Sequence, residues 1–122
     1  MSSDNSHRPL EPLPIVRALF LTFIQAHPQS TGYSLMKVIS GFTDGRVELK
    51  SGTVYTELRR LEKQGFVKSI QEEVGRKRRG YEITQAGEME LLQLAHQMRF
   101  RINRVLNPLL ALMEPLNGKL PR

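Results

Sequence analysis

The sequence predicts a mainly α-helical fold with a small β-hairpin wing: a winged helix-turn-helix followed by a long C-terminal dimerisation helix. Three observations support this prediction. Apolar residues recur at helical spacing in three short segments, two alternating segments flank a polar stretch, and a long periodic segment follows. The predicted parts are a flexible N-terminal arm at 1–13, a winged-helix domain at 14–84, the dimerisation helix at 85–113 and a disordered tail at 114–122.

The first two helices follow from apolar spacing and from the residues at their ends. The run from Ile15 to Ile24 is apolar around nearly its whole circumference, so we expect it to be covered on all sides. Pro14 suits its first turn, and His27-Pro28 ends it. Hydroxyl N-caps in Ser30-Thr31-Gly32 begin a second helix that runs to about Ser40.

A third helix and a hairpin complete the predicted domain. Gly41 to Gly45 is a loop, and the alternation in Arg46-Val47-Glu48-Leu49 is compatible with a very short strand. Ser51 is the predicted N-cap of a helix that runs to Gln64 and is stopped by Gly65. Residues 66–70 and 80–84 are the predicted strands, joined by a polar connection whose end is cationic.

Composition limits the class of protein and its partners. The 122 residues include no cysteine, which excludes a disulfide framework and a thiolate metal site. No apolar stretch approaches the ~20 residues of a membrane span, so we expect a soluble, cytoplasmic protein. The net charge of +6 favours a polyanionic partner, and the part from Arg46 to Arg79 holds ten basic residues against five acidic ones.

An enzyme is the first alternative, and the sequence argues against it. His7, His27 and His96 are scattered and lack metal-ligand spacing. The only aspartates are Asp4 and Asp44, and neither lies in the context of an activated nucleophile. We therefore expect no catalytic residue, no metal and no cofactor.

The third helix is the candidate recognition helix. Val54, Leu58 and Leu61 fall in one narrow sector and predict a core-facing stripe. The opposite sector carries small polar residues followed by cations, which can reach base edges and phosphates in a major groove. The alternative is a solvated face on which Arg59, Arg60 and Lys63 pair with Glu57 and Glu62.

Four consecutive cations, Arg76 to Arg79, lie at the predicted end of the hairpin. Their mutual repulsion would be relieved by a phosphate backbone, so a wing of this kind can grip a groove. The alternatives are a solubilising turn or a generic RNA-binding patch.

Three separated blocks of sequence together resemble the PadR family of transcriptional regulators. They are Gly32-Tyr33-Ser34-Leu35, the segment from Leu49 to Gly65 that contains Ser51-Gly52-Thr53-Val54-Tyr55, and the segment from Gly75 to Gly87. The resemblance extends from about Leu13 to Leu112. It implies a winged-helix dimer that binds operator DNA, usually as a repressor and often released by a small ligand.

The resemblance assigns the opening of the second helix to phosphate contact, and the third helix and the cationic wing to DNA. Ser51 and Thr56 stand where the family commonly has proline, which blurs the details of the contact. Packing and phosphate contact remain equally open for Tyr55. Together, these arguments predict the following DNA-binding residues: Gly32, Tyr33, Lys50, Ser51, Thr53, Tyr55, Thr56, Arg59, Arg60, Lys63, Arg76, Lys77, Arg78 and Arg79.

The last predicted helix carries a seam for pairing with a second copy. Its apolar residues follow a 4-3-4-3 spacing on one face, and we expect them to pack against the same helix and the first helix of the partner. An intramolecular hairpin would need a second long helix. Asn107-Pro108 should kink or interrupt the far end. The predicted interface consists of Leu19, Phe20, Phe23, Leu91, Ala95, Met98, Ile102, Val105, Leu109 and Leu112.

A dimer of this kind would read a pseudo-palindromic operator, with half-sites about one helical turn apart. A small apolar or aromatic effector could act by favouring one dimer geometry. An RNA-binding or protein-binding module is the second alternative, since winged helices serve these purposes too.

Overall fold

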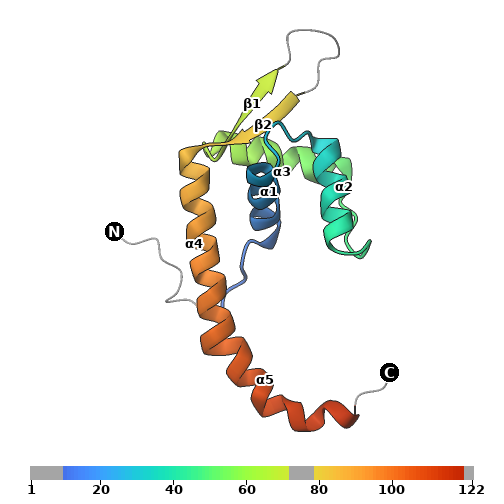
Figure 1. Ribbon diagram of the computed structural model, residues 1–122, viewed down its shortest axis with the longest axis vertical. Coiled ribbons are helices and arrows are strands. Elements are labelled where there is room, and N and C mark those ends of the chain that lie inside the picture. Colours follow the sequence, from blue (N-terminus) through green and yellow to red (C-terminus); the bar gives the residue numbers. More distant parts are fainter. Residues whose placement is uncertain (1–9, 72–78, 120–122) are drawn as a thin grey trace. The chain divides into compact units, whose positions relative to one another are not determined.

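The computed structural model describes residues 10–71 and 79–119 (Figure 1). The chain divides into two compact units. The winged-helix unit spans Pro14–Leu91, and the C-terminal unit combines the chain from Leu92 onwards with the segment before Pro14. Among the described residues, no helix has both the length and the hydropathy that crossing a bilayer requires.

Three helices open the winged-helix unit: α1 (Ile15–Ala26), α2 (Gly32–Phe42) and α3 (Ser51–Lys63). A capping box begins α2, in which Thr31 Oγ1 accepts from the Ser34 N–H at 3.0 Å and Ser34 Oγ accepts from the Thr31 N–H at 2.8 Å. The predicted hydroxyl cap is thus confirmed as Thr31. The predicted cap of α3 is wrong, because Ser51 is already helical and the N-cap is Lys50, without a side-chain hydrogen bond.

The hairpin consists of β1 (Val67–Gln71) and β2 (Arg79–Ile83), which are antiparallel with Val67 opposite Ile83. The expected strand at 46–49 is wrong, since residues 47–50 have no regular structure. The free edge of β2 pairs instead with Ser30, in the turn before α2. The Tyr81 N–H donates to the Ser30 carbonyl at 2.8 Å, and the Gln29 N–H donates to the Tyr81 carbonyl at 3.0 Å. Both the backbone N–H and the backbone carbonyl of Tyr81 are therefore hydrogen-bonded on this edge of β2.

The core of the winged-helix unit lies between the three helices and the hairpin. Its fully or almost fully buried members come from all five elements: Phe20, Leu21, Ile24, Leu35, Ile39, Val54, Leu58, Leu61, Val67 and Tyr81. Phe20 is fully buried in this cluster, so it offers no surface to a partner and is withdrawn from the predicted dimer interface. Within the described chain α1 is not covered all round, because Ile15 remains 50% exposed.

The long predicted helix is divided into three consecutive helical segments that differ in hydrogen bonding. It comprises α4 (Gln85–Arg101), the π-helical turn η2 (Ile102–Leu106) and α5 (Asn107–Met113). The Asn107 N–H donates to the Ile102 carbonyl, five residues back, just before Pro108. Proline cannot donate a backbone hydrogen bond and crowds the preceding turn, and a π turn accommodates both effects. The predicted interruption at Asn107-Pro108 is therefore confirmed, and Figure 1 shows the bend that leads into α5.

The predicted arm and tail are only partly described. Residues 10–13 form no helix or strand, and residues 1–9 lie outside the described range. Glu114–Lys119, expected to belong to a disordered tail, form the short 3-10 helix η3.

Candidate nucleic-acid interface

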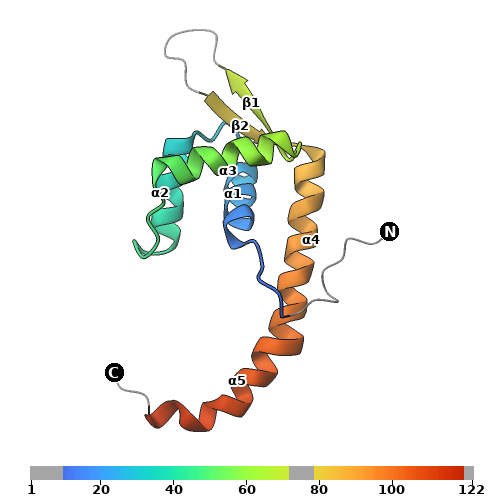
Figure 2. The same ribbon diagram turned by 180° about the vertical axis from the view of Figure 1, so that it is seen from behind.

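Helix α3 turns one apolar face inward and one polar face outward. Val54, Leu58 and Leu61 are fully buried, as their spacing predicted. In consequence the residues on the opposite side are exposed, and Figure 2 shows α3 on the near side of the winged-helix unit below the hairpin. The exposed residues of α3 that the sequence analysis assigned to DNA contact are Ser51, Thr53, Tyr55, Thr56, Arg59, Arg60 and Lys63.

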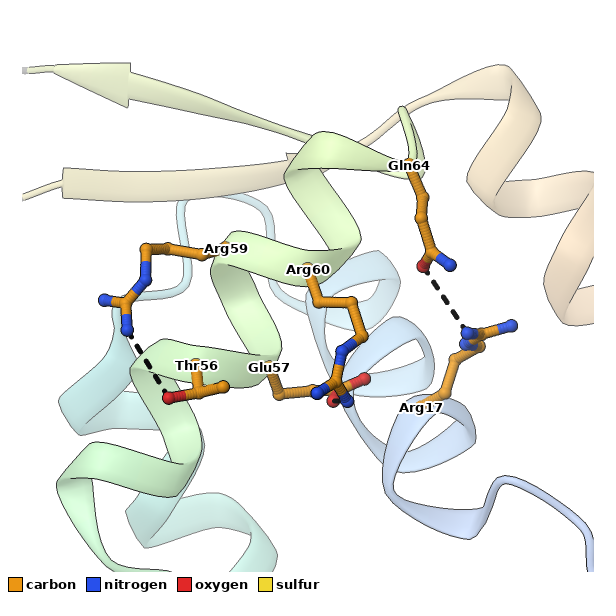
Figure 3. A network of polar contacts seen from close by, with 6 residues as sticks. All are labelled: Arg17, Thr56, Glu57, Arg59, Arg60 and Gln64. Carbon is orange, nitrogen blue, oxygen red and sulfur yellow. Dashed lines mark hydrogen bonds and ion pairs between the residues drawn. The ribbon is translucent and has the colours of Figure 1, made fainter.

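The two neighbouring arginines of α3 have different partners (Figure 3). Arg60 Nη1 forms an ion pair with Glu57 Oε1 at 2.9 Å, and this glutamate is almost buried. Arg59 Nη2 donates only a long hydrogen bond of 3.4 Å to Thr56 Oγ1, and both side chains are exposed. Among the described residues no carboxylate pairs with Arg59, so its charge is available to an external anion.

Glu62 has a different role from the one that pairing along the helix would give it. Its Oε2 accepts a hydrogen bond of 2.7 Å from the Ser69 hydroxyl of β1. The glutamate therefore ties α3 to the hairpin. The alternative of a fully paired, solvated charge face holds for Arg60 with Glu57 but not for Arg59.

The beginning of α2 lies against α3 through Tyr55. A Cβ built on Gly32 would lie 2.7 Å from Cε1 and Cζ of the Tyr55 ring, so the ring covers the glycine. Tyr55 nevertheless stays 43% exposed. Both roles left open by the sequence are compatible with this position: the ring packs on Gly32 while an edge remains available to a ligand.

Tyr33 adds an exposed aromatic ring beside Gly32. It is 64% exposed, and Lys37 Nζ lies 5.3 Å from the centre of its ring. Lys37 was not among the residues predicted from the sequence, although its spacing of four residues from Tyr33 on one helix face was the available signal. The structure thus places the Tyr55 ring on Gly32 and a lysine over the ring of the neighbouring Tyr33.

The cationic wing is described only at its root. Arg76, Lys77 and Arg78 lie outside the described residues, and Arg79 is described by its backbone, which pairs with Gln71. Lys50 is exposed at the N-terminus of α3. In the described part of the chain, no group of His, Asp and Glu side chains could hold a metal ion.

The residues predicted to form the dimer interface differ in how far they are buried. Leu19, Phe23 and Leu91 are half-buried against the winged-helix core, and Ala95, Met98 and Val105 are half-buried in the C-terminal unit. Ile102, Leu109 and Leu112 are exposed, Leu112 to 80%. Further exposed apolar side chains lie on the same unit at Leu92, Leu106, Leu110, Met113 and Leu116.

A three-helix core with an exposed polar third helix and an adjoining hairpin defines a winged helix-turn-helix protein of the DNA-binding class. Residues 20–93, more than half of the chain, match the family described as "Transcriptional regulator PadR-like family". The chain belongs to this family and is a transcriptional regulator rather than an enzyme. No protein of the curated set matches it in sequence.

Solved structures have the same fold. A transcriptional regulator from Clostridium thermocellum is 30% identical, with a TM-score of 0.68 over 76% of this chain and 90% of that chain. A PadR family regulator from Clostridium difficile R20291 is 28% identical, with a TM-score of 0.63 over 78% and 97% of the two chains. Bacillus subtilis PadR in complex with operator DNA is 22% identical, with a TM-score of 0.57 over 66% and 46%.

Proposed function

We propose that the chain is a cytoplasmic repressor that binds a pseudo-palindromic operator as a homodimer. The recognition helix α3 enters the major groove, and the basic wing contacts the backbone or the minor groove. The observation that carries this proposal is the exposed face of α3, where Arg59 is free of carboxylate partners among the described residues and stands one turn from Thr56.

Base recognition and phosphate binding are assigned to different residues of the interface. An arginine in the major groove can donate two hydrogen bonds to guanine, which makes Arg59 the candidate for sequence discrimination. Lys50 and Lys63 are point charges at the two ends of α3 and suit phosphate. Two exposed rings extend this phosphate contact: Tyr33 in the first turn of α2, and Tyr55 of α3, which covers Gly32. The B. subtilis protein of the same fold binds operator DNA, which supports the assignment.

Dimerisation is supported by the apolar surface of the C-terminal unit. Leu109, Leu110 and Leu112 are about half exposed or more on a single short helix that carries no charged residue. Full burial of a leucine contributes about 1.5–3 kcal/mol, so leaving this set in water is unfavourable. A second copy buries it and at the same time supplies the second recognition helix that a two-fold operator requires.

A small apolar or aromatic effector would act through the dimer. By binding one dimer geometry more tightly, it would shift the population between DNA-binding and released states. We assign it no site.

Selection of bound fragments from random and genomic DNA, followed by titration of the best duplex, tests this proposal. The selected duplex should be two-fold symmetric and should bind more tightly than a scrambled duplex and a structured RNA at one fixed salt concentration. Equal affinity for all three would reject the regulator, and preference for RNA would establish the RNA-binding alternative.

A pair of matched variants tests the assignment to α3. Arg59→Ala should reduce the preference for the selected duplex, whereas Arg104→Ala removes the same charge from an exposed position in η2 and should leave the preference unchanged. Equal behaviour of the two variants would argue against α3 as the reading element.

A further inference from the structure

Arg17 joins four segments of the winged-helix unit through one guanidinium group. Its Nη1 forms an ion pair with Glu90 Oε2 of α4 at 2.7 Å. Its Nη2 donates to Gln64 Oε1, the C-cap residue of α3, at 3.4 Å (Figure 3). Its Cζ lies 5.5 Å from the ring centre of Phe66, in the turn between α3 and β1. The arginine itself lies in the first turn of α1.

The Arg17–Glu90 pair is mostly shielded from water. The two side chains are only 23% and 19% exposed, and Arg17 Nε is buried without a partner among the described residues. Removing charges from water is unfavourable unless they are paired, and a shielded ion pair adds little net stability. Such a pair can instead contribute conformational specificity, because it favours the one arrangement of α1 and α4 in which both charges are paired.

The first turn of α4 is already fixed against the end of α3. The Thr84 N–H donates to the Phe66 carbonyl at 3.0 Å, and Thr84 Oγ1 donates to the Gly65 carbonyl at 2.5 Å. Gly87 is packed so closely that an added Cβ would overlap the Phe66 carbonyl oxygen. This contact fixes where α4 begins, but a single point of contact allows the helix to pivot.

Glu90 lies farther along α4 than this first contact. An ion pair there holds α4 at a second point, and two points define a direction. A small change in the angle of α4 becomes a large displacement at its far end because the helix is long. With 17 residues α4 is about 25 Å long, so a pivot of about 10° moves its far end by about 4 Å. This displacement is about one base-pair step of ~3.4 Å along DNA.

We propose that Arg17 is a positioning residue that sets the angle between the recognition helix α3 and the first two turns of α4. In the dimer this angle determines the separation of the two recognition helices, and therefore which spacing of half-sites is bound. The inference rests on the proposed function, because it needs a dimer with one α3 from each copy.

The separation can be measured without DNA. The chain has no cysteine, and a Cβ added at Gly52 of α3 meets nothing within 4 Å, so Gly52→Cys gives one spin-label site per protomer. Double electron–electron resonance on the dimer then reports the distance between the two recognition helices. We expect one narrow distance in the parent protein.

Two glutamate variants form a matched comparison. Glu90→Gln removes the charge that faces Arg17, whereas Glu57→Gln removes the charge of the other arginine pair, which lies entirely within α3. Glu90→Gln should broaden or shift the label distance by several ångströms, and Glu57→Gln should leave it unchanged. Glu90→Asp, which keeps the charge but shortens the reach, provides the same comparison with less risk to folding and should give a smaller shift. The double exchange Arg17→Glu with Glu90→Arg should restore a narrow distance.

The functional readout is the preference among half-site spacings. On the selected operator and on versions with one or two base pairs inserted between the half-sites, the parent should discriminate, and Glu90→Gln should reduce the discrimination ratio at least several-fold. If Glu90→Gln and Glu57→Gln both keep the parent distance and the parent spacing preference, the inference is overturned although the protein binds DNA. If the parent protein binds no duplex preferentially, the proposed function fails, and the label distances alone then decide the role of Arg17. A monomeric parent would overturn both.

Discussion

Gly87 offers the sharpest test of the packing between α4 and the end of α3. In Gly87→Ala the new methyl group would overlap the Phe66 carbonyl oxygen and would lie 2.7 Å from Ile83 Cγ1. The oxygen belongs to the backbone and accepts from the Thr84 N–H, so it cannot turn aside as a flexible side chain would. Either α4 moves away or the hydrogen bond is lost.

The size of the effect follows from two opposing contributions. Overpacking of a tight site typically destabilises by about 1–3 kcal/mol, and contact with backbone favours the upper end of that range. Alanine is better than glycine in a helix by about 1 kcal/mol, which offsets part of it. We expect a net loss of about 2 kcal/mol in the free energy of unfolding.

Gly41→Ala in α2 is the matched control. A Cβ at Gly41 meets nothing within 4 Å, so only the helix preference remains and the protein should gain about 0.5–1 kcal/mol. Urea unfolding followed by circular dichroism, at one protein concentration for all variants, measures both changes. Equal stability of Gly87→Ala and Gly41→Ala would show that α4 does not pack against the Phe66 carbonyl as described.

Three further outcomes are expected. Thr31→Ala removes the capping box of α2 and should lower the free energy of unfolding by about 1 kcal/mol in the same assay; no change would mean that the cap is replaced by water. Arg59→Ala should reduce discrimination between the operator and a mutated site by about 1–3 kcal/mol, while Lys63→Ala should weaken binding to all sequences and lower the salt slope by about one. Titrations across salt measure both, and identical effects would refute the division between base recognition by Arg59 and phosphate binding by Lys63. Leu109→Glu should dissociate the dimer in sedimentation, whereas Asn103→Glu, exposed on η2, should not; an unchanged sedimentation coefficient for Leu109→Glu would contradict burial of this residue between copies.

Much of the fold was predictable because its signals are local. The spacing of Val54, Leu58 and Leu61 predicted which face of α3 is buried, and all three are fully buried. Gly65 ends α3 with a φ of +84°, a conformation that favours glycine over other residues. Such signals depend on residues within one or two helical turns, so the sequence contains them directly.

The N-cap of α3 was misplaced by one residue, and the other main errors concern interactions between distant positions. Residues 46–49 alternate between polar and apolar as a strand does, yet residues 47–50 form no strand. The edge of β2 pairs with Ser30 instead, and neither segment carries a local signal that predicts this pairing. The same limit applies to the candidate site. Pairing of Arg60 with Glu57 could be read from their spacing, whereas the contact of Glu62 with Ser69, which leaves this glutamate bound to the hairpin, could not.

The amino-acid sequence by itself determined the order of the elements, the cationic character of the third helix and its hairpin, and the family. Short-range sterics and periodic burial govern these features, and both depend on residues that are close together in the sequence. Only the tertiary structure decided that Phe20 is core, that Arg59 and not Arg60 lacks a carboxylate partner among the described residues, and that Arg17 links α1 to α3 and α4. These outcomes depend on which distant groups folding brings within a few ångströms, and chain order alone does not contain that distance.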